Sequence, residues 1–172
     1  MPPLSIPDAP PPHPSDLIGV RPPFLHCGEK ATINWGQTPI SVVLDTNVLL
    51  DLWLFDDPRF VGVGALLAQG QARWLSTLEM REEFRRVLDY EHLARKRQAR
   101  GLGADALLQL FDRHAQLCLP APKAPYVCKD PDDQKFIDLA VAHQATLYSK
   151  DKYVLALKNR LARLNIEVRH SH

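Results

Sequence analysis

The chain has no long apolar run, few cysteines and almost no net charge. Its longest uninterrupted apolar stretch is only a few residues, so we expect no membrane span. The first residues provide neither a basic start nor an apolar segment, which predicts no secretory signal and a cytoplasmic protein. A net charge of +1 does not by itself indicate a class of partner.

The sulfur and imidazole groups do not form a recognisable metal motif. The three cysteines, Cys27, Cys118 and Cys128, are an odd and sparse set without Cys-x-x-Cys spacing. They fit a reduced protein better than a disulfide framework or a zinc site. The seven histidines also lack metal-ligand spacing. The sequence therefore favours oxygen ligands for any metal site.

Proline divides the chain into two parts. Residues 1–39 contain 10 of the 15 prolines, and proline fixes φ and lacks the N–H that helices and central strands need. We therefore predict an extended or disordered proline-rich extension over residues 1–38. Residues 39–172 are long enough, and apolar enough, for one folded domain with a sizeable core.

The folded part alternates short apolar runs with amphipathic stretches. We predict strands at residues 40–44, 72–75, 146–149 and 166–169. We predict helices at residues 47–55, 60–69, 77–89, 91–100, 104–117, 132–144 and 152–161. This alternation favours an α/β fold with three layers and a central, mainly parallel sheet covered on both faces.

Four acidic residues in separate segments are the candidate site. Asp45 and Asp151 each follow a predicted strand, where the active sites of open parallel sheets lie. On a helical wheel, Glu83 lies at the edge of the apolar arc of its helix, about 100° from Glu82. Asp133 lies within the apolar face of the candidate helix at residues 132–144.

Helix capping is the competing interpretation for these acids. Asp45 and Asp151 each stand before a predicted helix and Asp133 stands at the start of one, where a carboxylate can accept backbone N–H groups. Thr46 could cap the first helix, and Asp132 is the better capping candidate beside Asp133 because it points away from the apolar stripe. The two interpretations stay open for each residue alone, but two strand-end acids with two inward acids favour a common site.

Several carboxylates at one point need a cation between them, because like charges repel strongly. Oxygen ligands suit a hard ion such as Mg²⁺ or Mn²⁺, and such an ion suits phosphodiester hydrolysis. A basic segment over residues 81–100 could line a nucleic-acid groove or be a solvated helix face. The candidate contacts to nucleic acid are Arg85, Arg95, Arg97 and Lys150.

These motifs, in this order, resemble the PIN-domain family of metal-dependent nucleases over about Val42 to Val168. The matching pieces are Val-Val-Leu-Asp-Thr-Asn at residues 42–47, Glu-Phe-Arg-Arg-Val-Leu at 83–88, Asp-Pro-Asp-Asp at 130–133 and Ser-Lys-Asp-Lys at 149–152. The Asp-Pro-Asp-Asp piece most resembles the branch that contains toxins of toxin–antitoxin pairs. Lys150 departs from the pattern, since a small residue is common there, and the proline-rich extension lies outside it.

The resemblance implies Mg²⁺ or Mn²⁺ binding and hydrolysis of RNA. It makes Asp45, Glu83, Asp133 and Asp151 the catalytic and metal-binding acids, supported by Asn47 and Ser149 through hydrogen bonds or water. It also implies a cognate antitoxin as a partner, and a homodimer. The alternatives are a housekeeping nuclease without an antitoxin, a catalytically silent interaction module, and a phosphatase with Asp45 as nucleophile. Asn47 stands where that phosphatase would need a second aspartate.

Overall fold

The computed structural model describes residues 38–171. The proline-rich extension predicted over residues 1–38 therefore lies outside the described residues, apart from residue 38. Five strands form one all-parallel sheet in the order β3-β2-β1-β4-β5. These strands are β1 (Ile40–Leu44), β2 (Ala72–Ser76), β3 (Ala115–Leu117), β4 (Thr146–Tyr148) and β5 (Val168–Arg169). The predicted α/β fold with a parallel sheet is confirmed.

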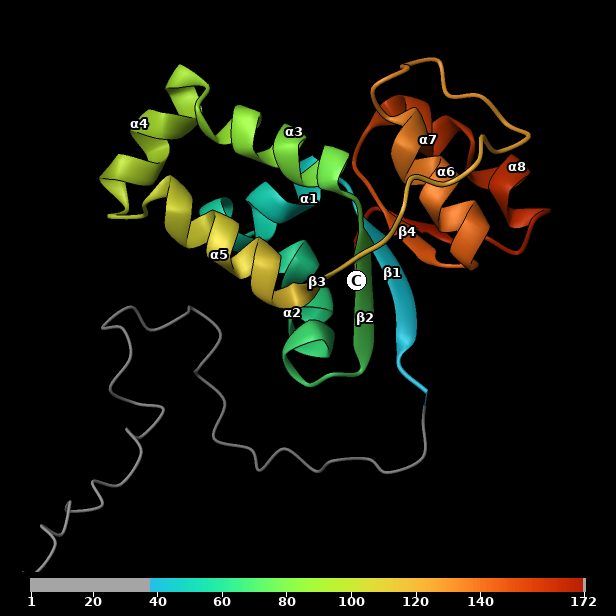
Figure 1. Cartoon of the computed structure of the whole chain (residues 1–172), viewed down its shortest axis with the longest axis horizontal. Helices are drawn as coiled ribbons and strands as arrows, with labels where there is room; N and C mark the ends of the chain where they lie inside the picture. The colour runs from blue at the N-terminus through green and yellow to red at the C-terminus, as the bar shows by residue number, and fades with distance from the viewer. Residues whose placement is uncertain (1–37, 172) are drawn as a thin grey trace, which may run out of the picture. The chain divides into compact units, whose positions relative to one another are not determined.

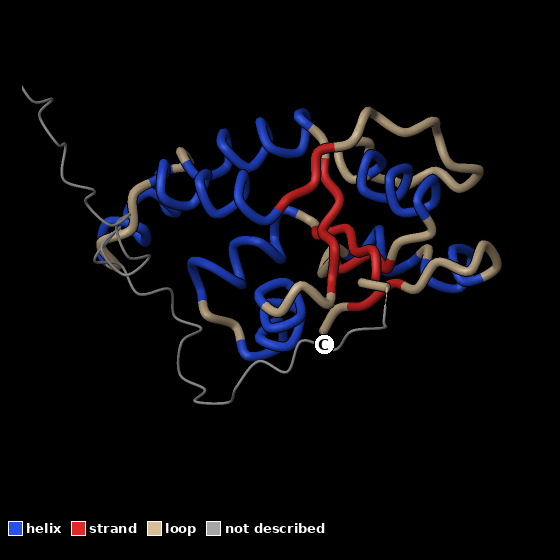
Figure 2. Tube along the Cα trace, turned by 60° about the horizontal axis from the view of Figure 1, so that its bottom comes forward, coloured by secondary structure: helices blue, strands red, loops and turns tan. Residues whose placement is uncertain are grey.

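The helices cover both faces of this sheet and make three layers. The first group is α1 (Thr46–Leu50), η2 (Asp51–Phe55), η3 (Pro58–Phe60), α2 (Val61–Ala68), α3 (Leu78–Leu88), α4 (Glu91–Ala99) and α5 (Ala104–His114). The second group is α6 (Gln134–His143), α7 (Lys152–Ala156) and α8 (Lys158–Ala162). Figures 1 and 2 show the two groups on opposite sides of the strands. None of the helices among residues 38–171 has the length and apolar character that a membrane crossing needs.

Each face of the sheet has its own core. On the side of the first group, the rings of Trp53, Trp74, Phe84 and Phe111 pack edge-on or stacked, with centroids 4.5 to 5.9 Å apart. On the other side, the apolar face of α6 packs with β4, α7 and α8, and Phe136 and Ile137 are fully enclosed there. The β-branched residues Val42 and Val43 of β1 are 0% exposed, as expected for a strand covered on both faces.

The chain changes direction across the sheet at β1. It runs outward from β1 through β2 to β3, and then returns to place β4 and β5 on the other side of β1. In open parallel sheets, ligands bind beyond the carboxyl ends of the strands at such a switch point. Asp45 follows β1 and Asp151 follows β4 by three residues, so both acids lie at this point.

Three local predictions are wrong. Residues 115–117 were expected to continue a helix, but they form β3, because pairing with Trp74–Ser76 outweighs the helix propensity of Ala-Gln-Leu. Asp45, not Thr46, caps α1, since its carboxylate accepts the Asn47 N–H. Asp132 does not cap α6, which begins at Gln134.

Candidate functional site

Asp45 is fixed at the bottom of the candidate site by two hydrogen bonds. It is 2% exposed, its Oδ2 accepts the Ser149 hydroxyl at 2.7 Å, and its Oδ1 accepts the Asn47 backbone N–H at 3.2 Å. Burial raises the pKa of Asp45 above its usual range, while these two bonds oppose the rise. Asn47 thus supports Asp45 through its backbone, and its side chain is exposed.

Ser149 joins Asp45 to Asp151. Its hydroxyl donates to Asp45 and accepts the Asp151 N–H at 3.0 Å, and Ser149 is 0% exposed. Asp151 in turn accepts the N–H groups of Tyr153 and Val154 at 2.6 and 3.3 Å through one oxygen, Oδ1. Asp151 is therefore a helix cap as well as a site candidate, so the two interpretations of its sequence position do not exclude each other.

Asp133 carries the clearest electrostatic signature of the site. Burial, and then the charges of Asp45, Asp151 and Asp130, raise its pKa to about 7, and a side-chain hydrogen bond with Asp151 acts in the same direction. Asp133 stands at the cap position of α6 without any capping bond from its side chain. Its carboxyl group therefore lies among other acids and does not cap the start of α6.

Glu83 is positioned by partners that sequence reasoning missed. Its Oε1 accepts the Thr46 hydroxyl at 2.6 Å, and its Oε2 lies 2.6 Å from the Lys135 ammonium. The Lys135 ammonium also donates to the Asp132 carbonyl at 2.6 Å, which links α3 to the start of α6. The Thr46–Glu83 pair spans 37 residues, so no local pattern could have indicated it. Glu82, by contrast, is exposed and pairs with Arg85.

The donor set fits a hard divalent cation in its chemistry. The charges of Asp45 and Asp151 both raise the pKa of Asp133, because neighbouring carboxylates repel each other, and a cation among them could offset that repulsion. Within residues 38–171, the carboxylates are not already closed into a metal-holding cluster of three or more His, Cys, Asp or Glu side chains. Asp45, Asp133 and Asp151 are the residues that would hold the ion.

The predicted nucleic-acid contacts are mostly engaged within the protein. Arg85 pairs with Glu82 at 2.7 Å and Arg95 pairs with Glu91. Arg97 is 9% exposed and donates to the carbonyls of Leu88 and Leu102. Lys150 turns inward and pairs with Asp51 of the π-helical segment η2, a carboxylate that is itself 4% exposed.

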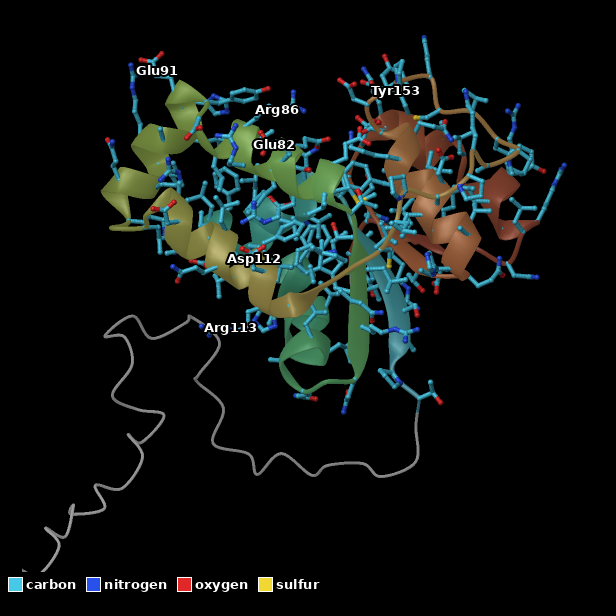
Figure 3. All side chains as sticks on the ribbon, viewed as in Figure 1. Glu82, Arg86, Glu91, Asp112, Arg113 and Tyr153 are labelled. Carbon is cyan, nitrogen blue, oxygen red and sulfur yellow. The ribbon has the colours of Figure 1, made fainter. Side chains whose placement is uncertain are left out.

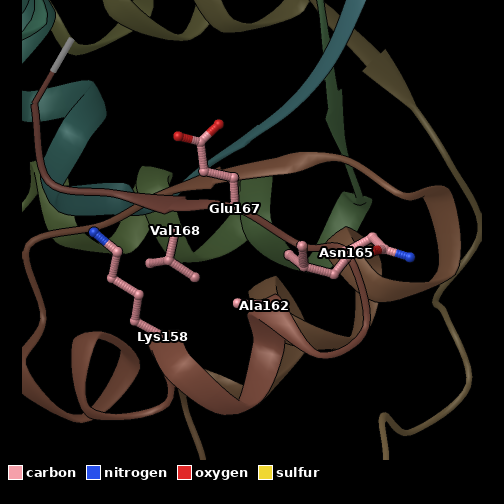
Figure 4. A pocket seen from close by; sticks show the side chains of 6 residues that line it. Lys158, Ala162, Asn165, Glu167 and Val168 are labelled. Atoms are coloured by element: carbon pink, nitrogen blue, oxygen red, sulfur yellow. The ribbon is translucent and has the colours of Figure 1, made fainter.

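One pocket lies away from these acids, between α8 and the approach to β5. Its lining residues are Lys158, Ala162, Asn165, Ile166, Glu167 and Val168 (Figure 4). Residues 165–167 precede β5, so the pocket is at the amino end of that strand, whereas the acids follow the carboxyl ends of β1 and β4. The pocket is separate from the candidate site.

Comparison with known proteins finds a match at the level of the family. A family model described as "PIN domain" matches residues 41–147, more than half of the chain. The match covers Asp45, Glu83 and Asp133 and ends two residues before Ser149. Nuclease function in general, and use of divalent metal ions, is usual in that family. No curated protein matches the chain.

Proposed function

The chain belongs to the PIN-domain family, and from that premise we propose that it is a divalent-metal-dependent ribonuclease that hydrolyses RNA phosphodiester bonds. The observation that carries the proposal is the meeting of Asp45, Asp133 and Asp151 at the switch point of the sheet, with the pKa of Asp133 raised to about 7. A buried Asp45 with two partly buried aspartates beside it is an arrangement of like charges that a bound cation would stabilise.

In this proposal, Mg²⁺ or Mn²⁺ is held by the three aspartates. A bound divalent ion makes water more acidic and offsets charge that develops on phosphoryl oxygens. Ser149 holds Asp45 and the Asp151 backbone at a fixed separation. With a pKa raised to about 7, Asp133 is only partly ionised near neutral pH, so a cation would compete with a proton for this carboxyl group.

Glu83 has a positioning role in this proposal. Both of its oxygens are engaged, one by Thr46 and one by Lys135, and its charge lies close enough to Asp45 to affect that residue's pKa. We therefore assign Glu83 to orienting the site from α3. Release of Lys135 would make Glu83 available as a further ligand.

Cleavage of a labelled single-stranded RNA tests the nuclease proposal. Wild type is expected to cut with Mn²⁺ or Mg²⁺ and not with EDTA, and Asp133→Asn is expected to be inactive. Asp132→Asn, an exposed neighbour in the same loop, is the matched control and should cut like wild type. Equal cutting by Asp133→Asn and wild type would assign the activity to a contaminant, and no cutting by any of them would contradict the proposal.

We also propose that the ribonuclease is a toxin with a cognate antitoxin protein, which the Asp-Pro-Asp-Asp segment at residues 130–133 supports. Induced expression in bacterial cells should stop growth, and Asp133→Asn should not. Co-expression with the product of an adjacent small gene for a DNA-binding protein should restore growth. Normal growth with active wild-type enzyme would favour a housekeeping nuclease instead. A homodimer remains part of the proposal and is tested by the mass measured in solution.

A further inference from the structure

Two lysine side chains lie over one tyrosine ring beside the acidic cluster. The ammonium of Lys152 is 4.8 Å from the ring centroid of Tyr153, and the ammonium of Lys129 is 5.4 Å from it. Lys152 opens α7, while Lys129 comes from the loop before α6. Figure 3 labels Tyr153 at the side of the molecule formed by α7 and this loop. Segments 23 residues apart in the chain therefore build one cationic and aromatic surface.

The two ammonium groups are exposed and have no carboxylate partner within the described residues. The lysine ion pairs there join Lys135 to Glu83 and Glu79, and Lys150 to Asp51. Lys129 and Lys152 thus keep their charges close together over one ring without an internal counter-ion. Fixed positive charge of this kind is available to an anion from solution.

This surface is joined directly to the candidate site. The Tyr153 N–H donates to Asp151 Oδ1 at 2.6 Å, so the ring stands two residues from a candidate metal ligand. Lys129 precedes Asp130, whose charge contributes to the raised pKa of Asp133. A polymer that contacts the lysines and the ring would therefore pass beside Asp133 and Asp151.

The Tyr153 ring is half-buried, and part of it packs on the core beneath α7. That packing holds the ring in place, so little side-chain freedom is lost when a flat ligand stacks on it. Aromatic rings stack with the face of any base, and adjacent lysines contact phosphates. A base must be unpaired to offer its face, which favours a single strand over a duplex.

We propose that Tyr153, Lys129 and Lys152 form a subsite for single-stranded RNA, in which the two exposed lysines swing off the Tyr153 ring to contact phosphates and a base takes their place on it. The subsite rests on the proposed ribonuclease function, because it names how the substrate reaches the acidic cluster. It explains recognition without base identity, since stacking and phosphate contacts accept every base.

Fluorescence anisotropy of a fluorescein-labelled single-stranded oligouridine, measured in EDTA, tests the subsite without any cleavage. Tyr153→Leu should weaken binding by about tenfold, whereas Tyr153→Phe should stay within about twofold of wild type. The double variant Lys129→Gln/Lys152→Gln should reduce the slope of log K against log salt by about 1.4, which corresponds to two lost phosphate contacts.

Matched controls come from the other basic region of the molecule. Tyr90 is 55% exposed at the turn between α3 and α4, and Lys96 is exposed on α4. Tyr90→Leu and Lys96→Gln should leave the affinity unchanged. A labelled single-stranded DNA and a duplex RNA are the comparison ligands: the DNA should show the same loss with Tyr153→Leu, and the duplex should show none.

The outcomes separate this proposal from the nuclease proposal. Thermal melting first establishes that each variant is folded. Folded Tyr153→Leu binding like wild type, equal weakening by Phe and Leu, or no binding of single strands by wild type would each overturn the subsite. The expected binding losses together with an absence of metal-dependent cleavage would retain the subsite and overturn the ribonuclease.

Discussion

Two basic regions flank the acidic cluster, and they differ in how their charge is balanced. Along α3 and α4, Arg81 forms a two-pronged pair with Asp112 at 2.5 and 2.7 Å, and Arg85 and Arg95 also have carboxylate partners. Beside α7, Lys129 and Lys152 lie over the ring of Tyr153 and have no carboxylate partner among residues 38–171. Positive charge in the sequence therefore says little about RNA contact until its partners are known.

The first region has more basic residues, but most of them have partners within the protein. Arg97 ties the end of α3 to the turn after α4 through two carbonyls, and Arg100 bonds the Leu54 carbonyl and Asp56. Arg86 and Lys96 are the exposed bases of α3 and α4 that have no ion pair within the described residues. Figure 3 labels Arg86 on the same stretch of α3 and α4 as the acidic residues Glu82 and Glu91.

The largest expected loss of stability is at Arg97, and it tests whether this arginine stabilises the fold or binds RNA. Arg97→Ala leaves the carbonyls of Leu88 and Leu102 without their donor, so we expect the free energy of unfolding to fall by about 2 to 4 kcal/mol. Urea denaturation measures this fall, with exposed Lys96→Ala as the control at under about 0.5 kcal/mol. A stable Arg97→Ala that binds RNA less tightly would place Arg97 in the substrate path.

Lys150 offers the second test, because the sequence alone suggested a phosphate contact. Lys150→Met leaves the buried Asp51 carboxylate without its counter-charge, and we expect a loss of about 2 to 3 kcal/mol in unfolding free energy. Lys152→Met, on the other side of Asp151, should leave stability unchanged. The reverse order of these two losses would contradict the assignment of Lys150 to the interior and Lys152 to the surface.

In the acidic cluster, removal of a charge should raise the free energy of unfolding, whereas removal of Arg97 or Lys150 should lower it. The raised pKa of Asp133, about 7 against 3.8, means that the native state binds more protons than the unfolded state between these values. The contribution of Asp133 to the free energy of unfolding therefore falls as pH rises through this window and is lowest above pH 7. In EDTA at pH 8, Asp133→Asn should stabilise the protein by about 1 to 2 kcal/mol, after allowance for solvent screening of this half-exposed group.

Chemical denaturation at a series of pH values measures this difference. The gain from Asp133→Asn should shrink as pH falls from 8 and vanish below the unfolded-state pKa of 3.8, where the carboxyl group is protonated in both states. Asp132→Asn should show no such trend. A destabilising Asp133→Asn at pH 8 would show that the carboxylate contributes a favourable interaction to the metal-free fold.

The smallest effect is expected at the exposed helical pairs. The side chains of Arg95 and Glu91 are 75% and 79% exposed, and an ion pair in that position contributes little. Arg95→Gln should change unfolding free energy by less than about 0.5 kcal/mol and leave RNA affinity unchanged. A clear loss of RNA affinity in Arg95→Gln would indicate that the substrate binds along α4.

The sequence predicted the parts of this structure that depend on local pattern. Apolar runs located β1, β2 and β4, and the acids at strand ends follow from the topology of a parallel sheet. The helical wheel separated half-buried Glu83 from exposed Glu82. The sequence could not predict β3, the Lys135–Glu83 pair or the burial of Arg97, because each depends on residues that meet only in the folded chain.

The most direct test of the acidic cluster is calorimetric titration of the purified protein with Mn²⁺ near pH 7. We expect saturable binding by wild type with release of a proton, visible as a dependence of the heat on the buffer, since the pKa of Asp133 is about 7 in the metal-free protein. Asp132→Asn should behave in the same way, and Asp133→Asn should lose the proton release and most of the affinity. Equal Mn²⁺ binding by Asp133→Asn and wild type, or no binding by either, would contradict the central claim that these aspartates hold a divalent metal ion.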